Sequence, residues 1–419
     1  MAFAEQAHSG IATVLSERTQ SLSEPSRRCA GKPRPTGTGI DILYHHRTRS
    51  SDGQSVHIDE LIKALEQEGA CVRMVGPRRT DAMSESRGKQ ILPKPVYELL
   101  ELAYSGVELI KLAKAIRKKR PDAIYERANV YTLSGVWASR LFSLPLILEV
   151  NAPLAEERAK FGGLALPRIA RWSEELVWRS ADHVLPVTEV LGDLIESVGA
   201  SSSRILVTSN GIDMDKFSAP ESPDRSLLPS SFGSGPVLGF VGYVRAWHGL
   251  PQIVQLLARD SLLSQANLLI VGDGPGVPDI VRRAGELGIA GRVSVTGIVG
   301  RDALAPYISL FDIALQPEVT PYASPLKLFE YMALSRAIVA PNSPNIREIL
   351  TDGTDALLFE PNDATSLAQA IRALAADPGF RSSLGSAAAR KIVEDDITWS
   401  RNARRVISLI RSAQRKQSG

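Results

Sequence analysis

Cysteine and long apolar runs are both scarce in this sequence. Its two cysteines, Cys29 and Cys71, lie in different regions and match no metal-ligand spacing. We therefore expect a reducing compartment and no disulfide framework. No apolar run approaches the ~18–20 residues needed to span a bilayer, and the N-terminus lacks the apolar core of a signal peptide. These absences predict a cytoplasmic protein, which can still touch the inner face of the cell membrane.

A large charge excess is also absent. The formal net charge is +3, which gives no argument for a nucleic-acid partner. The chain has 419 residues, of which 44% are hydrophobic and 23% charged. It is therefore long enough for two globular domains that each bury a core.

The order of the apolar patterns predicts the domain organisation. Residues 1–38 are rich in Ser, Arg, Gly and Pro without periodicity, and we expect a disordered N-terminal extension there. Short β-branched runs then alternate with helical patterns across 39–215, and again across 216–396. A loop at 218–236, with four prolines and six serines, opens the second unit. Residues 397–419 are expected to form a C-terminal crossover helix, able to pack across both domains, and a tail.

Alternation of this kind predicts the α/β class, with two doubly wound, Rossmann-like domains. Strands are expected at 40–44, 71–75, 123–125, 146–150, 184–187 and 205–208, and then at 237–241, 267–271, 293–296, 313–315, 337–340 and 356–359. The longer helices are expected at 56–68, 96–119, 165–180 and 399–411. Ligands of open α/β sheets bind at the carboxyl ends of the strands, so we expect a site in a cleft between the domains.

The strongest chemical pattern is Ser324-Pro-Leu-Lys-Leu-Phe-Glu-Tyr-Met-Ala333. Ser324 suits an N-cap and Pro325 the first helical position. The free amides of that first turn, the helix dipole and Lys327 together predict an anion site. Glu330 lies one turn further on nearly the same face, where it can accept hydrogen bonds from a ribose. A capped surface helix with a Lys–Glu pair is the alternative.

This segment resembles the signature of the retaining, sucrose-synthase-like glycosyltransferases of group 1, which have a GT-B fold. In that family a Glu, seven residues and a second Glu frame the donor site. The second Glu corresponds to Glu330, and the first position is Tyr322 here. The Ser-Pro-x-Lys pattern resembles a subgroup that also lacks a standard first Glu. The resemblance implies that Tyr322, Ser324, Pro325 and Leu326 line the donor site.

Three more segments resemble the donor side of this family. Residues 239–249 resemble the strand and loop that meet the donor diphosphate, with Arg245 replacing a charge that relatives carry nearby. Residues 269–275 match as well, and are not a dinucleotide fingerprint because the third glycine position is Val277. Residues 295–299 resemble the wall around the base. Loop packing is the alternative role for the aromatic residues of the first segment. The implied donor contacts are Gly242, Arg245, His248, Gly272, Gly274, Gly297 and Val299.

In the first domain, two segments resemble the sugar and acceptor side of the family. Residues 52–57 resemble a glycine-rich turn and helix start, where Gly53 lets the backbone approach the reacting group. Residues 146–153 occupy the place where many relatives present a His to the donor sugar. Asn151 takes that place here and can only hydrogen-bond the sugar. The predicted strand ends add His45, His46, Glu126 and Arg127. Structural histidines and a structural Glu126–Arg127 pair are the alternatives.

No metal-binding cluster is evident in the sequence. Asp213-Met-Asp215 has the form of a metal-binding Asp pair, but no further His, Cys or carboxylate adds ligands at a convincing spacing. We expect no metal ion and no other cofactor.

The resemblance implies an enzyme of EC class 2.4, a glycosyl- or hexosyltransferase. It would move a sugar with retention from a nucleoside-diphosphate sugar to a glycan or lipid-linked acceptor, in polysaccharide or cell-envelope glycan synthesis. Fixed cations stabilise the leaving diphosphate, so the catalytic candidates are Arg245, Lys327 and Glu330. No protein general base is evident, and the resemblance implies front-face substitution. A nucleotide-sugar epimerase of the same fold and a catalytically silent sugar-nucleotide-binding subunit are the alternatives.

One helical stretch carries a local basic excess. Residues 108–120 hold six Lys or Arg against one acid, Glu108. Apolar residues at helical spacing are expected to face the core, so the basic residues project outward. Lys111, Lys114, Arg117 and Lys118 could then attract an anionic membrane surface. A solvated helix face is the alternative.

Overall fold

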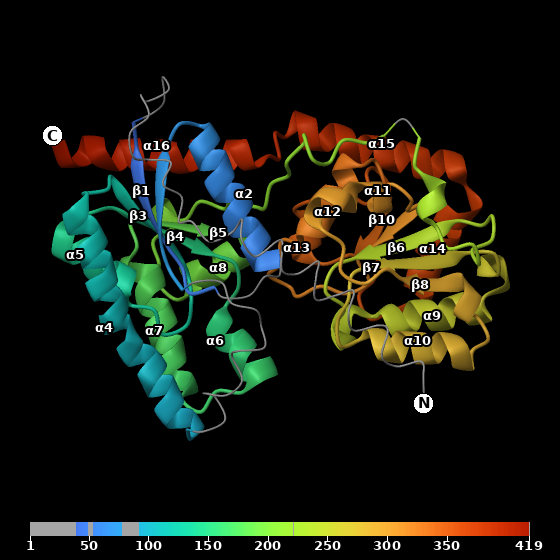
Figure 1. The fold of residues 1–419 in the computed structure, drawn as a ribbon, viewed down its shortest axis with the longest axis horizontal. Helices are drawn as coiled ribbons and strands as arrows, with labels where there is room; N and C mark the ends of the chain where they lie inside the picture. Colours follow the sequence, from blue (N-terminus) through green and yellow to red (C-terminus); the bar gives the residue numbers. More distant parts are fainter. Residues whose placement is uncertain (1–38, 49–52, 78–91, 221, 419) are drawn as a thin grey trace, which may run out of the picture.

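The computed structural model describes residues 39–48, 53–77, 92–220 and 222–418. The extension expected at 1–38 lies outside the described residues. Two α/β domains stand side by side, and the chain runs from the first to the second and then returns to the first (Figure 1). Each domain is a parallel sheet with helices on both faces, so the predicted fold class is confirmed.

The first domain contains a five-stranded parallel sheet in the order β2-β1-β3-β4-β5. Its strands are β1 Asp41–His45, β2 Cys71–Val75, β3 Ala123–Arg127, β4 Leu146–Val150 and β5 His183–Pro186. Tyr44 of β1 lies beside Tyr125 of β3 in the register, and their rings stack at 5.1 Å. All residues of β1, β3 and β4 are buried, so both faces of these strands are covered.

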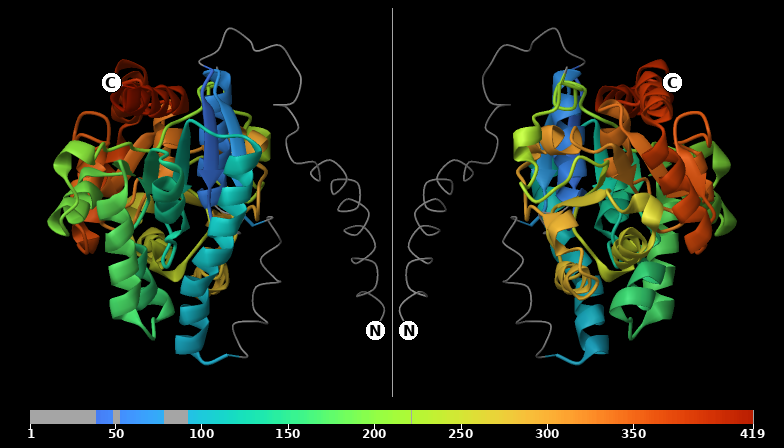
Figure 2. Two further views of the ribbon diagram at one scale, coloured as in Figure 1. Left: turned by 90° about the vertical axis from the view of Figure 1, so that its left-hand side faces the viewer. Right: turned by 90° about the vertical axis from the view of Figure 1, so that its right-hand side faces the viewer.

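Two helical layers cover this sheet. One face packs against α4 Lys94–Lys118, α5 Ser134–Phe142, α7 Pro167–Ser180 and α8 Glu189–Ser197. The other face packs against α2 Gly53–Gln67 and the C-terminal helix α16 Trp399–Ser418. A short α6, Leu154–Glu157, and a π-helical turn, Arg158–Gly162, follow β4. Figure 2 shows the C-terminal end of the chain, in red, next to the blue elements at its start, and α16 contacts α2, so the end of the chain completes the core of the first domain.

The second domain contains a six-stranded parallel sheet in the order β11-β10-β9-β6-β7-β8. Its strands are β6 Val237–Val241, β7 Asn267–Val271, β8 Val293–Val295, β9 Ile313–Leu315, β10 Ala337–Pro341 and β11 Leu357–Phe359. One face packs against α11 Leu304–Ile308, α12 Leu326–Ala333, α13 Pro344–Arg347 and α15 Pro378–Glu394. The other packs against α9 Leu250–Arg259, α10 Val277–Glu286 and α14 Ala364–Ala376.

The chain crosses between the domains twice, and the two crossings lie together. Ile212, on the way out, pairs with Thr398, on the way back. A Cβ on Gly211 would lie 2.5 Å from the backbone of Thr398 and Trp399. Glycine therefore permits the close approach of the two crossing segments.

Two expectations from the sequence are wrong. Residues 205–208 run beside β5 but form no strand, because only Ile205 makes a bridge, to Val184. Cys71 is disulfide-bonded, against the expectation of no disulfide. The other cysteine, Cys29, lies outside the described residues. No helix in the described part of the chain is long and apolar enough to cross a membrane.

Candidate functional site

The core of the site is the start of α12, which a buried tyrosine holds at the end of β6. The Tyr331 hydroxyl accepts a hydrogen bond from the Val241 amide at 3.0 Å. Leu328, Phe329 and Met332 are buried in the same core. These contacts fix the first turn of α12 beside the carboxyl end of β6, the position expected for a ligand site in an α/β sheet.

The start of α12 differs from the predicted cap. The helix begins at Leu326, Pro325 is the cap residue, and no side chain caps the helix. Ser324 is buried and bonds elsewhere: its Oγ accepts from the Asn210 amide at 3.3 Å, and its carbonyl accepts from Asn210 Nδ2 at 2.6 Å. The prediction of Ser324 as N-cap is therefore wrong. Because no side chain occupies the cap, the first-turn amides can meet an anion.

Lys327 is the cation of this site. Its ammonium lies 3.8 Å from the centre of the Phe240 ring, and it forms no ion pair with any described residue. Burial, only partly offset by Glu330, lowers the pKa of Lys327 to about 7. A half-buried ammonium without a counter-ion, at the start of an uncapped helix, is suited to binding an anionic group.

Glycines at the ends of β6 and β7 bring backbone close to this ammonium. A Cβ on Gly242, where φ is +127°, would lie 3.5 Å from Lys327 Nζ. A Cβ on Gly272 would lie 2.1 Å from the Gly242 carbonyl oxygen, so Gly272 allows the two turns to pack together. Gly272 also bridges Gly297. The predicted donor glycines, including Gly274, thus gather around neighbouring strand ends.

Arg245 and His248 lie in the loop after β6 but differ in environment. Arg245 is exposed and its guanidinium stacks on Tyr243 at 5.2 Å. His248 is buried, and its Nδ1 accepts from the Arg245 amide at 3.0 Å. Burial, with Lys327 and Arg245 nearby, lowers the pKa of His248 to about 3. The ring is therefore neutral and carries its proton on Nε2, as a donor.

Glu330 is buried and already has a partner. Its Oε1 accepts from Arg301 at 2.7 Å, and Arg301 also lies 3.8 Å from Glu60 on α2. Arg301 was not foreseen from the sequence. Arg301 thus links Glu330 of the second domain to Glu60 of the first domain.

Leu326 and Tyr322, both predicted donor contacts, also touch the first domain. Leu326 packs against the core cluster that contains α2 and α16. Tyr322 packs against the core cluster on the other face of the first domain's sheet, which contains α7 and α8. Its carbonyl accepts from Thr188 Oγ1 at 3.0 Å. Burial and the neighbouring Glu157 raise the pKa of Tyr322 to about 12, so its phenol stays neutral. The third apolar candidate, Val299, packs on the core of the second domain.

The predicted contacts at the ends of β1 and β3 are buried among protein partners. His45 Nδ1 lies 2.6 Å from Glu126 Oε2, and Nε2 lies 3.8 Å from Glu108. Burial lowers the pKa of His45, but the two carboxylates outweigh it and raise the pKa to about 9. His46 packs against Gly76. The geometry supports the structural alternative for both histidines, and Glu126 is engaged by His45.

Arg127 and Asn151 meet at the end of β4 instead. Both contact the buried carboxylate of Glu149: Arg127 as an ion pair, and Asn151 through its Nδ2 at 2.5 Å. Glu126 and Arg127 therefore do not pair with each other, which corrects that alternative. One N–H of the Asn151 amide is engaged by Glu149, which leaves its oxygen to accept from a sugar hydroxyl and its second N–H to donate. Gly53 is the first residue of α2.

The Asp213-Met-Asp215 segment is occupied by protein cations. Asp213 bonds Lys63 at 2.6 Å and lies 3.9 Å from Lys216. No group of three potential metal ligands occurs within the described ranges.

Comparison with known proteins agrees with the two-domain architecture. The family model for Glycosyltransferase Family 4 matches residues 51–216, and that for Glycosyl transferases group 1 matches residues 235–377. D-inositol 3-phosphate glycosyltransferase of Xylanimonas cellulosilytica is 26% identical over 371 residues, which cover 81% of this chain and 87% of that protein. Alpha-D-kanosaminyltransferase of Streptomyces kanamyceticus is 24% identical over 60% of this chain and 66% of its own length.

A solved structure supports the same assignment at the level of the fold. Alr3699/HepE of Anabaena, in complex with UDP, superposes with a TM-score of 0.68 at 18% identity, covering 89% of this chain and 100% of that one. The matched models lie on the two sheets in turn, and the uncapped helix with Lys327 lies within the second. The chain belongs to the group 1 glycosyltransferases and has their GT-B fold.

Proposed function

We propose that the protein transfers a sugar, with retention, from a nucleoside-diphosphate sugar to a glycan or lipid-linked acceptor. The observation that carries this is the unpaired Lys327 ammonium at the uncapped start of α12. A diphosphate supplies the counter-charge that the site lacks. The UDP in the Anabaena neighbour is consistent with such a donor. Polysaccharide or cell-envelope glycan synthesis is the setting that fits a lipid-linked acceptor.

The proposed reaction breaks the bond between the sugar C1 and the diphosphate oxygen. Lys327 and the first-turn amides of α12 neutralise the charge that develops on that oxygen. Glu330 accepts from the ribose, and the Asn151 oxygen accepts from a sugar hydroxyl. The acceptor oxygen forms its bond to C1 on the face that the diphosphate leaves, and its proton passes to the departing phosphate. No metal ion has a step in this scheme.

The test is incubation with a panel of labelled nucleoside-diphosphate sugars, with and without lipid-linked acceptors, each with and without EDTA. We expect an acceptor-dependent product with the donor's anomeric configuration, formed equally in EDTA. An epimerised donor without acceptor would indicate an epimerase. Binding without any turnover would indicate a silent subunit, and activity restored only by a divalent ion would overturn the metal-free scheme.

Nucleoside diphosphate binding should weaken with rising pH. In the free protein the Lys327 ammonium exists below its pKa of about 7 and is lost above it. A bound diphosphate favours the charged form, so binding takes up a proton above pH 7. The Kd for UDP should rise by about tenfold per pH unit from 7 upward, until the pKa of the complex is reached. Calorimetry between pH 6 and 9 checks this, and Lys327→Arg, which stays charged, should flatten the profile.

The exposed face of α4 favours an anionic membrane as a further partner. Lys111, Lys114, Arg117 and Lys118 are all exposed. The one acid of this run, Glu108, is buried and bonds Arg47 at 2.6 Å, so it does not reduce the surface charge. The outward face of this helix end is therefore wholly basic among its ionisable groups.

Apolar side chains continue the same surface. Six large or medium apolar residues are exposed along α4: Val96, Leu99, Leu100, Tyr104, Val107 and Ile110. They follow helical spacing on the side that carries the lysines. Trp137 and Leu141 of the adjacent α5 are exposed as well. Apolar residues beside a basic cluster are typical of surfaces that rest on a lipid headgroup layer.

Replacing Lys111, Lys114 and Lys118 by glutamate should release the protein from anionic vesicles. Three contacts of about 1 kcal/mol each predict a roughly 100-fold weaker partition at low salt. Co-sedimentation with vesicles of neutral and mixed anionic composition measures it. The matched control makes the same charge change at exposed Arg225, Arg259 and Arg390 of the second domain. Equal loss in both variants, or binding indifferent to lipid charge, would contradict the surface.

A further inference from the structure

A continuous chain of polar contacts joins the donor helix to the acceptor side of the first domain. It starts at Ser324, whose carbonyl accepts from Asn210 Nδ2 at 2.6 Å. The Asn210 Oδ1 lies 2.6 Å from Nδ1 of His57 on α2. His57 Nε2 lies 3.0 Å from Glu149 Oε1 at the end of β4. Glu149 in turn accepts from Asn151 at 2.5 Å.

The directions of these contacts are fixed by chemistry. Because Asn210 Nδ2 donates to Ser324, its Oδ1 must accept, so His57 donates from Nδ1. The other ring nitrogen faces a carboxylate. Burial raises the pKa of Glu149, but His57 and Arg127 outweigh it and hold the pKa well below its usual range. The carboxylate is therefore charged, and among the described residues only His57 contacts both it and Asn210.

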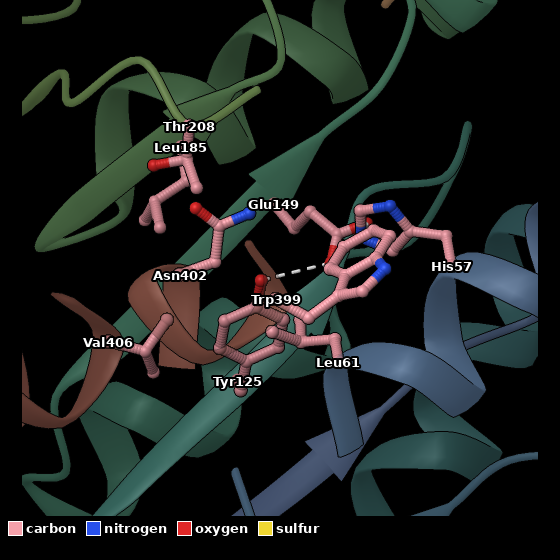
Figure 3. Close-up of a pocket in the computed structure, with 9 residues that line it drawn as sticks. All are labelled: His57, Leu61, Tyr125, Glu149, Leu185, Thr208, Trp399, Asn402 and Val406. Carbon is pink, nitrogen blue, oxygen red and sulfur yellow. Dashed lines mark hydrogen bonds and ion pairs between the residues drawn. The ribbon is translucent and has the colours of Figure 1, made fainter. Parts of the chain in front are cut away.

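His57 also lies where the chain crosses between the domains. Asn210 belongs to the outgoing segment, and Trp399 begins the helix after the returning segment. The Trp399 ring contacts the His57 ring edge-on, with centres 4.9 Å apart. Figure 3 shows His57, Glu149 and Trp399 together on one side of a cavity of about 10 Å³. His57 itself is buried.

We propose that His57 is a positioning residue, which sets the start of the donor helix relative to Asn151. Through Asn210 it holds Ser324, three residues before Lys327. Through Glu149 it orients the Asn151 amide. Without this bridge the start of α12 and Asn151 are no longer held at a fixed position relative to each other, although each domain keeps its own fold. The role in transfer rests on the proposed function; the bridging role does not.

His57→Phe tests the bridge, because it keeps a ring against Trp399 and removes both nitrogens. Asn210→Ala cuts the same bridge on the other side of His57. The matched control is Tyr125→Phe. It removes the 2.9 Å hydrogen bond that the Tyr125 hydroxyl donates to Glu149 and leaves the contacts of His57 in place. We expect His57→Phe and Asn210→Ala to lower kcat at least tenfold. Their Kd for UDP, and the kcat of Tyr125→Phe, should stay within threefold of wild type.

A loss of kcat in Tyr125→Phe equal to that in His57→Phe would overturn the proposal, because it would reflect general loosening around Glu149. Unchanged kcat in both bridge variants would overturn it as well. If the wild type transfers no sugar, the proposed function fails, and amide hydrogen exchange of the ligand-free proteins decides the bridge. Faster exchange at 209–212 and 324–328 in the two bridge variants alone is expected. Equal exchange in all three variants would refute it.

Discussion

Replacing Lys327 by alanine is expected to lower kcat for sugar transfer by about 10²–10³-fold, the usual cost of removing one donor that stabilises developing negative charge. Its ammonium is the only one at the start of α12 among the described residues, and it has no carboxylate partner to rearrange. Charge on the diphosphate oxygen grows as the glycosidic bond breaks. Lys327 therefore stabilises the transition state more than the bound donor.

Glu330→Ala is the informative comparison. Its hydrogen bond to the ribose is made in both the bound donor and the transition state, so its loss should raise the Kd for donor by roughly tenfold or more and change kcat less. Steady-state kinetics with calorimetry of UDP binding separates the two variants. Lys327→Ala with wild-type kcat would remove this residue from the mechanism. Unchanged donor affinity in Glu330→Ala would remove the ribose contact.

The fold was predictable because each strand carries a local signal. The run Val237–Val241 carries no polar side chain and Leu146–Val150 carries only Glu149, which is the pattern of parallel strands buried on both faces. Residues 205–208 have a similar composition and donate two backbone hydrogen bonds to β5, and sequence alone does not show that they stop short of a strand. The apolar pattern of the sequence therefore locates buried segments well, but it is less able to show which of them pair as strands.

The start of α12 shows why part of the site was not predictable. A Ser-Pro pair before a helix is a good capping pattern. In the structure, Asn210 competes for Ser324 from 114 positions earlier in the sequence. That contact depends on how the domain crossing folds. The Lys–Glu pair that the sequence left open does not form, because Glu330 pairs with Arg301 and Lys327 forms no ion pair with any described residue.

The contacts of the buried polar residues in the first domain were even harder to predict from the sequence. His45 and Glu126 stand at strand ends, which favoured a substrate role, but they bond each other at 2.6 Å. His57 and Glu149 lie inside segments that were noted for other reasons. Nothing in their spacing of 92 positions indicates a contact. Long-range pairs of this kind are set by sheet order and helix packing, and not by local periodicity.

Trp399→Ala is expected to destabilise the first domain by about 3–5 kcal/mol, the range for truncating a fully buried aromatic side chain. Trp399 is 3% exposed and begins α16, whose Ala403, Val406 and Ile407 fill the same core. The sequence suggested that this helix could pack across both domains. In the structure its apolar side packs on the first domain, against α2 and the sheet.

Urea unfolding followed by tryptophan emission measures the loss, because Trp178, also 3% exposed, reports on the same domain. The matched control is Trp172→Ala, which removes a 49% exposed tryptophan from α7 and should cost under about 1 kcal/mol. Equal midpoints for the two variants would contradict the role of α16. The expected difference has a consequence for synthesis. Since the last helix completes the first domain's core, that domain cannot reach its full stability until the second domain has been made.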